Sequence, residues 1–290
     1  MSAHKIKIGI LNYHSGINYG AFLQCYALYS LTADQGLDVQ VINYKNIRHW
    51  FLEYRYFLFR INPRIFFSNI QKIRNFKKLL KQMALTKFTW SISSLKHKKY
   101  DYIIATGYQK IISNQILSKA KIKALNIHPG SIYNPGAGCY SYPIFNKEKF
   151  SGVTCHELSA KPDTGTVLIE KRFILYSNDD FTSLQGRTLV TVLQIFYEIM
   201  DIIIQKKKFP ISKNQWKRKP RYQKNYINDL LNINLKRDTK NIIQLKIRSA
   251  NPSYPGPYVD IDGVKKTVRI INGKLKVVDK KFVKSFKYGK

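Results

Sequence analysis

Residues 5–11 read Lys-Ile-Lys-Ile-Gly-Ile-Leu, a short apolar run that is typical of a buried β-strand. A polar, glycine-containing turn follows, and apolar residues then recur at helical spacing over residues 21–31, with Gly36 as the predicted stop. Residues 37–44 have the character of a second strand. Strand, turn, helix and strand form a βαβ unit whose helix N-terminus can accept a phosphate. No full GxGxxG sequence is present, so the turn glycines are explained equally well by a tight turn alone.

A second stretch, Leu125-Asn126-Ile127-His128-Pro129-Gly130, carries side chains that suit transfer of an acyl group to an amine. The attack forms a tetrahedral oxyanion, which an amide donor such as Asn126 can stabilise. His128 lies two residues further on, so both side chains project to one face of an extended segment. Its imidazole can carry the proton of the amine, and Asp163 can orient the ring. A structural explanation stands beside this one, because a histidine before proline can end a strand with its ring bonded to the backbone.

Several motifs around this stretch occur in a fixed order. They are Tyr100–Tyr108, Asn126–Gly130, Asn134–Cys139, Gly152–His156, Lys161–Gly165 and Ile247–Gly256. This order resembles the formyltransferases that use N10-formyltetrahydrofolate, which act on methionyl-tRNA, glycinamide ribonucleotide or sugar nucleotides. The resemblance runs from about residue 101 to about residue 273. It implies an α/β, Rossmann-like domain with a mostly parallel sheet, followed by a small β-rich C-terminal appendage.

The resemblance also implies roles for individual residues. Asn126 matches the oxyanion-stabilising asparagine of that family, and His128 and Asp163 match its catalytic histidine and aspartate. The implied co-substrate is N10-formyltetrahydrofolate. Its predicted contacts are Thr106, Gly107, Tyr108, Ile111, Leu158 and Lys161. His156 only flanks a motif, and we expect it to be structural or to support the catalytic residues.

The first third of the chain resembles another family. Residues 6–28 and 41–44 are similar to the opening of polysaccharide pyruvyl transferases, and this resemblance fades before residue 100. The chain stops far short of that family's second half, so we do not expect pyruvyl transfer.

Composition agrees with a soluble cytoplasmic enzyme. A chain of 290 residues with 44% hydrophobic residues can build one large domain with a small appendage. The three cysteines form no CxxC pair, which indicates neither a disulfide framework nor a metal site. The N-terminus lacks the uninterrupted apolar run of a signal peptide. Residues 189–204 predict a core-packing helix with an inward face of Leu189, Val192, Leu193, Phe196, Met200 and Ile203.

The formal net charge of +33 is unevenly distributed. Residues 45–99 contain fourteen Lys or Arg and one acid, Glu53, interleaved with aromatic residues. This pattern fits peripheral contact with an anionic membrane, such as the inner membrane face, and it fits equally a solvated helical face with the aromatics packed inward. Nucleic-acid binding is the less favoured explanation.

Two further basic runs help to define the domains. Residues 206–224 contain nine basic residues and no acid, and they are predicted to be a linker. Residues 258–278 alternate apolar and polar around Asp262-Gly263 and Asn272-Gly273, which are hairpin signals. We therefore expect a catalytic domain over 1–205, divided at residue 99/100, then a basic linker and helix over 206–241 and a β-rich region over 242–290.

The small C-terminal region favours one acceptor class over another. The methionyl-tRNA enzymes of the resembled family carry a C-terminal barrel that grips tRNA, and too few residues follow Ile242 for five ordinary strands. The leading hypothesis is formylation of a nucleotide-linked amino sugar for surface polysaccharide such as lipopolysaccharide, with a homodimer as a candidate assembly. Methionyl-tRNA formylation and a non-catalytic basic scaffold on membrane or RNA are the alternatives.

Overall fold

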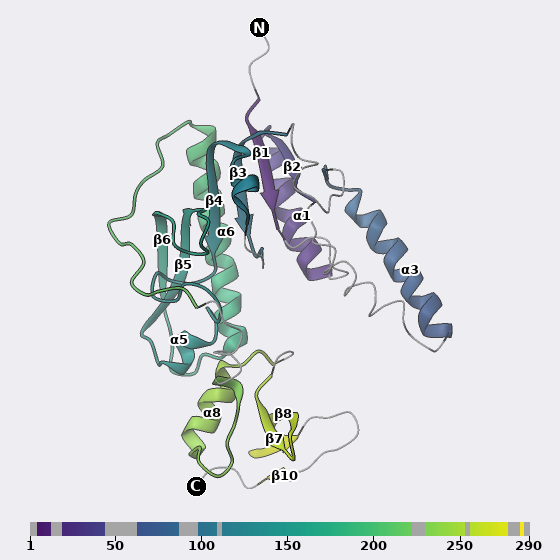
Figure 1. Ribbon diagram of the computed structural model, residues 1–290, viewed down its shortest axis with the longest axis vertical. Helices are drawn as coiled ribbons and strands as arrows, with labels where there is room; N and C mark the ends of the chain where they lie inside the picture. The colour runs from purple at the N-terminus through teal and green to yellow at the C-terminus, as the bar shows by residue number, and fades with distance from the viewer. Residues whose placement is uncertain are drawn as a thin grey trace. The chain divides into compact units, whose positions relative to one another are not determined.

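The computed structural model describes residues 5–12, 19–43, 63–86, 98–108, 112–221, 230–252, 256–277 and 285–286 (Figure 1). The chain divides into two compact units. Unit 1 is formed by residues 1–127 and 156–165, and unit 2 is formed by residues 128–155 and 166–290. The domain boundaries drawn from the sequence stay predictions.

Unit 1 is built on parallel strands. β1 (Lys7–Leu11) pairs with both β2 (Asp38–Val41) and β3 (Tyr100–Thr106), and β3 pairs with β4 (Ala120–His128). Their order is β2-β1-β3-β4. Every residue of β3 is buried, as expected for a strand covered on both faces of a parallel sheet. The parallel α/β fold predicted from the sequence is confirmed.

Helix α1 (Tyr19–Asp34) connects β1 to β2 and completes the predicted βαβ unit. Gly36 stops the helix as expected, because its φ of +76° is accessible mainly to glycine. Its N–H donates to the carbonyl of Ala33 at 2.8 Å. The turn that precedes the helix, at residues 13–18, lies outside the described residues.

The basic region 45–99 is described only in part. Helix α3 (Pro63–Leu80) places Phe76 in the core, where its ring meets that of Phe22 edge to face at a centroid distance of 6.0 Å. Phe67 on the same helix is 68% exposed. The aromatic residues between 50 and 59 lie outside the described residues. One aromatic ring packs inward and another faces solvent. The region therefore still fits both membrane contact and a solvated helical face with inward-packed aromatics.

Unit 2 contains the short helix α5 (Tyr142–Phe145), most of β5 (Phe150–Glu157), β6 (Val167–Ile174) and the long helix α6 (Phe181–Ile204). α6 confirms the predicted core-packing helix, and Val192, Phe196, Met200 and Ile203 are buried as expected.

The predicted inward face of α6 was wrong at two residues. Leu189 is 44% exposed and Leu193 is 39% exposed. The helix begins at Phe181, eight residues before the predicted start, and its buried face is centred on a row that includes Leu184, Ile195 and Ile199. A helix so rich in apolar residues cannot bury all of them on one face, and the spacing alone did not determine which row is buried.

Asp180 caps the N-terminus of α6. Its side chain accepts a hydrogen bond from the N–H of Ser183 at 2.8 Å, and the Ser183 hydroxyl accepts one from the N–H of Asp180 at 3.0 Å. This reciprocal capping box satisfies two N–H groups that the helix leaves without partners.

We predict that Asp180→Ala lowers the free energy of unfolding by about 1 kcal/mol. Urea denaturation followed by circular dichroism measures this change. Asp260→Ala, the same substitution at an exposed strand position, serves as the control and should change stability by less than about 0.5 kcal/mol. Equal effects at both positions would show that the capping box contributes nothing.

The C-terminal part of unit 2 is a small sheet packed on a helix. Strands β7 (Tyr258–Ile261), β8 (Val264–Ile271), β9 (Lys274–Val277) and β10 (Ser285–Phe286) pair in the antiparallel order β10-β9-β8-β7. Helix α8 (Lys240–Ser249) contributes Ile243 to the apolar core of this sheet. The β-rich appendage predicted from the sequence is confirmed.

Both predicted hairpin turns are present. Asp262 and Gly263 have φ values of +53° and +75°, and Asn272 and Gly273 have φ values of +51° and +70°. Positive φ at both central residues is the requirement of the two-residue turn that matches the twist of a hairpin, and Asp-Gly and Asn-Gly are the pairs that favour it.

Candidate functional site

The site begins where two parallel strands of unit 1 end. β3 and β4 pair so that Ala105 lies opposite Asn126 and Thr106 opposite Ile127. The carboxyl ends of neighbouring parallel strands are the usual place for a ligand in an open α/β sheet. Asn126 is half-buried at this edge.

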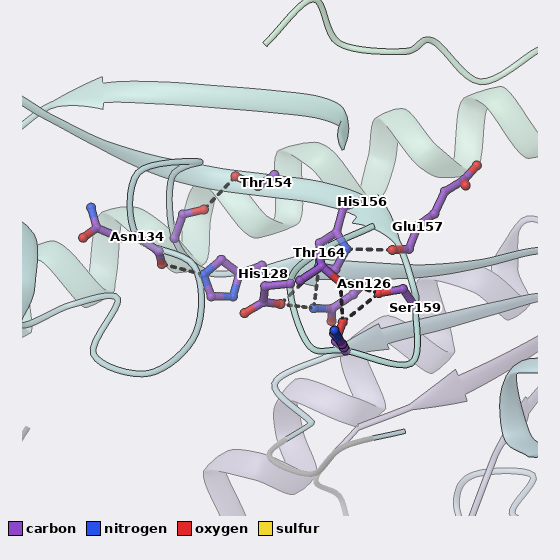
Figure 2. Close-up of polar contacts among 11 residues, drawn as sticks. Asn126, His128, Asn134, Thr154, His156, Glu157, Ser159 and Thr164 are labelled. Atoms are coloured by element: carbon purple, nitrogen blue, oxygen red, sulfur yellow. Dashed lines mark hydrogen bonds and ion pairs between the residues drawn. The ribbon is translucent and has the colours of Figure 1, made fainter. Parts of the chain in front are cut away.

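Asn126 lies in a polar cluster with His156, and both are labelled in Figure 2; Asp163 completes the cluster. The Asn126 Nδ2 is 3.1 Å from His156 Nε2 and donates to Asp163 Oδ1 at 3.4 Å. His156 Nε2 is 3.2 Å from the same carboxylate oxygen. The sequence analysis had predicted Asn126, His128 and Asp163 in one site, with Asp163 orienting the His128 ring. The structure brings Asn126 and Asp163 together, and the histidine that meets Asp163 at 3.2 Å is His156. The supporting role of His156 stays a prediction.

The contacts of His156 constrain where its proton lies. Its Nδ1 is 2.8 Å from the backbone carbonyl oxygen of Glu157, which can only accept, so Nδ1 carries the hydrogen. On a neutral ring Nε2 then carries the lone pair, which can accept from Asn126 Nδ2 at 3.1 Å. A proton between Nε2 and Asp163 Oδ1 can be carried by either group, so the His156–Asp163 pair can hold one proton beside the Asn126 amide.

The loop that carries Asp163 holds a strained conformation. Asp163 has a φ of +48°, which is uncommon for a residue other than glycine. The hydroxyls of Ser159 and Thr164 both donate to the carbonyl of Lys161, at 2.7 Å and 2.8 Å. These bonds close the loop on itself and fix the position of the carboxylate.

Gly165 follows at a point with no room for a side chain. A Cβ added there would lie 1.8 Å from the carbonyl oxygen of Glu157. We predict that Gly165→Ala destabilises the protein by about 1–3 kcal/mol, because backbone must shift to admit the methyl group. The matched control is Gly186→Ala in α6, where nothing lies within 4 Å and alanine favours the helix by about 0.5–1 kcal/mol.

Thermal unfolding of the two glycine variants measures the difference, with the Gly165 variant melting below the wild type and the Gly186 variant at or above it. A Gly165 variant as stable as the wild type would contradict the close packing of this loop.

His128 lies at the end of β4 and contacts Asn134 and Trp216, which both belong to unit 2. Its Nε2 is 3.0 Å from the backbone oxygen of Asn134, so Nε2 is the donor and Nδ1 carries the lone pair when the ring is neutral. The ring also meets Trp216 edge to face, with centroids 5.9 Å apart. Gly130 is required here, because a Cβ would lie 2.5 Å from His128 Nε2. His128 is 5% exposed, and these contacts hold its ring in one orientation.

The loop after His128 is held by the segment that the sequence analysis predicted as a linker. The N–H of Lys217 donates to Ile132 at 3.0 Å, and the N–H of Ala137 donates to Arg221 at 2.8 Å. Gly136, with a φ of +81°, forms an isolated parallel bridge with Arg221. Residues 217–221 therefore fasten the loop whose backbone holds His128.

Side chains strengthen the same loop. Asn134 donates from Nδ2 to Glu148 at 2.7 Å and accepts at Oδ1 from Arg221 at 3.3 Å. Arg218 pairs with Glu148 at 2.9 Å. The Arg221 guanidinium lies over the Tyr142 ring at 4.1 Å from its centroid, and burial lowers the pKa of Arg221 from its ordinary value. Sequence reasoning missed these supports, because their only signal was the turn-forming Asn-Pro-Gly at 134–136.

Residues 78–199 match the sequence model of a known family, the formyl transferases. By this similarity, we call residues 78–199 the formyl transferase domain. It contains Asn126, His128, His156 and Asp163.

Individual relatives match parts of the formyl transferase domain and its surroundings. A bifunctional polymyxin resistance protein ArnA of Wigglesworthia glossinidia brevipalpis is 29% identical over 154 residues, which are 50% of this chain and 23% of that protein. A methionyl-tRNA formyltransferase of Clostridium tetani is 30% identical over 113 residues, or 39% of this chain and 36% of that protein. The chain thus spans about a quarter to a third of the length of these relatives.

Solved structures share the fold over nearly the whole chain. A sugar N-formyltransferase from Shewanella sp FDAARGOS_354 superimposes with a TM-score of 0.62 at 17% identity, covering 92% of this chain and 98% of that one. A 4-N formyltransferase from Francisella tularensis gives a TM-score of 0.64 at 17% identity, covering 91% and 96%. The fold of the formyl transferase domain and of the C-terminal region is therefore that of these proteins.

The predicted folate-side residues of the formyl transferase domain lie mostly in one place. Thr106 is buried at the end of β3, and Gly107 beside it has a φ of +61°. Tyr108 and Leu158 pack against the same apolar cluster. Lys161 is exposed, and Ile111 lies outside the described residues. A folate-binding role for these residues stays a prediction.

Two other findings concern the described part of the chain. No group of three or more His, Cys, Asp or Glu side chains there could hold a metal ion. Within the same ranges, no helix has the length and apolar character needed to cross a membrane.

Proposed function

We propose that this protein transfers a formyl group from N10-formyltetrahydrofolate to the amine of a nucleotide-linked amino sugar. The observation that carries the proposal is the cluster of Asn126, His156 and Asp163 inside the formyl transferase domain, with His128 at the end of the same strand as Asn126. These residues supply an oxyanion donor, a shared proton and a fixed imidazole.

Each residue has a role in the proposed reaction. The neutral amine attacks the formyl carbon, and the Asn126 amide stabilises the oxyanion that forms. His128 takes the proton of the attacking nitrogen on Nδ1, while its Nε2 stays bonded to the Asn134 carbonyl. His128 then gives this proton to the folate nitrogen as its bond to the formyl carbon breaks, and Asp163 with His156 assists this transfer.

The choice of acceptor and donor is supported by proteins of the same fold. The N-formyltransferase of Helicobacter canadensis was solved with folinic acid and dTDP-3-aminofucose, and it covers 94% of this chain at 18% identity and a TM-score of 0.56. The sugar 3N-formyl transferase WlaRD was solved with dTDP and 5-N-formyl-THF. A sugar nucleotide also suits a C-terminal region whose described strands form a sheet too small to resemble a tRNA-gripping barrel.

The proposal extends to cellular context. We infer a place in surface polysaccharide assembly, such as that of lipopolysaccharide, and action in the cytoplasm. Contact with an anionic membrane through residues 45–99 is supported by α3, where exposed Ile65 and Phe67 accompany basic residues. A homodimer is compatible with the exposed apolar side chains of α6, including Val190 and Tyr197.

The test is an acceptor panel. Purified protein is incubated with N10-formyltetrahydrofolate and nucleotide-linked 3-amino or 4-amino sugars, or with methionyl-tRNA, and release of tetrahydrofolate is followed beside a His128→Ala control. Release that depends on an amino sugar and is lost in the control supports the proposal. Release only with methionyl-tRNA would replace the acceptor, and no folate binding by calorimetry would favour the scaffold alternative.

A further inference from the structure

Unit 2 contains a cavity of about 670 Å³ that the proposed reaction does not use. It lies among the start of α6, the helix α8 and the strand β8, all of which belong to unit 2. Its lining contains none of Asn126, His128, His156 and Asp163. A volume of this size is in the range that holds a small metabolite.

One part of the lining is apolar. Leu245 and Ile247 come from α8, Val268 and Ile270 come from β8, and Pro257 precedes β7. Such a surface suits an aromatic or aliphatic portion of a ligand, which is removed from water when it binds.

The charged side chains that line the cavity are mostly cationic. Lys147, Arg248 and Arg269 are cationic, and Asp180 is the one carboxylate among the lining residues. The Oδ1 of Asp180 is already used to cap α6, where it accepts from the N–H of Ser183. The cavity therefore favours a ligand with a negative charge.

Each of the two arginines is held by a hydrogen bond to a backbone carbonyl and keeps other N–H groups that can donate to a ligand. Arg248 donates from one terminal nitrogen to the carbonyl of Ser177, and Arg269 donates to the carbonyl of Pro252 at 2.7 Å. The Nε of Arg248 is buried and has no hydrogen-bond partner among the described residues. Buried N–H groups in proteins are nearly always paired with an acceptor, which a ligand can supply here. A guanidinium binds a phosphate or carboxylate through two parallel hydrogen bonds.

We propose that this cavity binds a small organic anion, with its phosphate or carboxylate group at Arg248 and Arg269 and its apolar body against Leu245 and Val268. The ligand is a free small molecule that occupies unit 2 whether or not the formyl acceptor is bound. This inference does not depend on the proposed formyl transfer.

The experiment uses three probes that share one aromatic body: naphthyl phosphate, naphthoate and the uncharged naphthalenemethanol. Calorimetry on the full chain measures the Kd of each. We expect the anions to bind at least tenfold more tightly than the alcohol, and the better of the two anions identifies the head group. Equal binding of the alcohol, or no binding of either anion, would overturn the proposal.

Variants locate the binding. Arg248→Gln and Arg269→Gln should each raise the Kd of the preferred anion by about tenfold. Arg237→Gln removes the same charge from an exposed position outside the cavity and should leave the Kd unchanged. Gln244→Trp, on the exposed face of α8 that lines the cavity, should block binding without altering charge.

Circular dichroism confirms that each variant is folded, and the Gln244 variant tests the site even if an arginine variant is unstable. If Arg237→Gln weakens anion binding as much as Arg248→Gln and Arg269→Gln do, the anion is attracted by the general charge of the chain and the proposal is wrong.

Discussion

Asp163→Asn is expected to lower kcat for formyl transfer by about 10²–10⁴-fold, while KM for the acceptor changes little. The substitution keeps the size of the side chain but removes the carboxylate that faces His156 Nε2 at 3.2 Å and Asn126 Nδ2 at 3.4 Å. An amide cannot hold the shared proton of the pair. Asp163 is 8% exposed and His156 is 1% exposed, so water does little to replace the lost carboxylate oxygen.

Steady-state kinetics with the acceptor identified by the panel measure this effect. Asp260→Asn, on an exposed position of β7, is the matched control and should retain wild-type kcat. Equal thermal stability of both variants would assign the loss to the reaction rather than to folding. A kcat for the Asp163 variant within threefold of the wild type would exclude Asp163 from the proton path.

Lys246→Met is expected to lower the free energy of unfolding by about 3–5 kcal/mol. Lys246 is 7% exposed, and its Nζ donates to Asp238 Oδ2 and to the carbonyl of Asn232, both at 2.6 Å. Methionine fills a similar volume but leaves the buried Asp238 carboxylate without its cation. The cost arises from this uncompensated charge rather than from lost packing.

Urea denaturation measures the change in stability, with Lys236→Met at an exposed neighbouring position as the control. Adding Asp238→Asn to the Lys246 variant should recover part of the loss, because the carboxylate is then neutral. A double variant less stable than the single one would show that the charge of Asp238 is not the source of the cost.

The fold could be predicted from the sequence wherever local chemistry determined it. The βαβ opening, the stop at Gly36 and the two hairpins around Asp262-Gly263 and Asn272-Gly273 depend on periodicity and on turn residues that few alternatives can replace. The buried face of α6 could not be predicted in full. Its apolar residues surround most of the helix, so tertiary packing decided that Leu189 and Leu193 face solvent.

The candidate site, like the fold, could be predicted only in part from the sequence. Asn126 and Asp163 were assigned to one site, with His128, from their types and from a resemblance, and the structure places Asn126 and Asp163 in hydrogen-bond contact. The contact between His156 and Asp163 could not be predicted, because it depends on how the loop between these residues folds and on the Glu157 carbonyl that accepts from the other ring nitrogen. The contacts of Trp216 and Arg221 with the His128 loop join segments more than 80 residues apart in the sequence, and no local pattern signals such contacts.

The chain passes from one compact unit to the other three times, after residues 127, 155 and 165. The ten residues 156–165 thus return to unit 1 and bring His156 and Asp163 to Asn126. No single cut separates the two units. A fragment that ends before residue 156 lacks two of the three members of the cluster, and a chimera that exchanges unit 2 must keep this ten-residue piece from the same parent as residues 1–127.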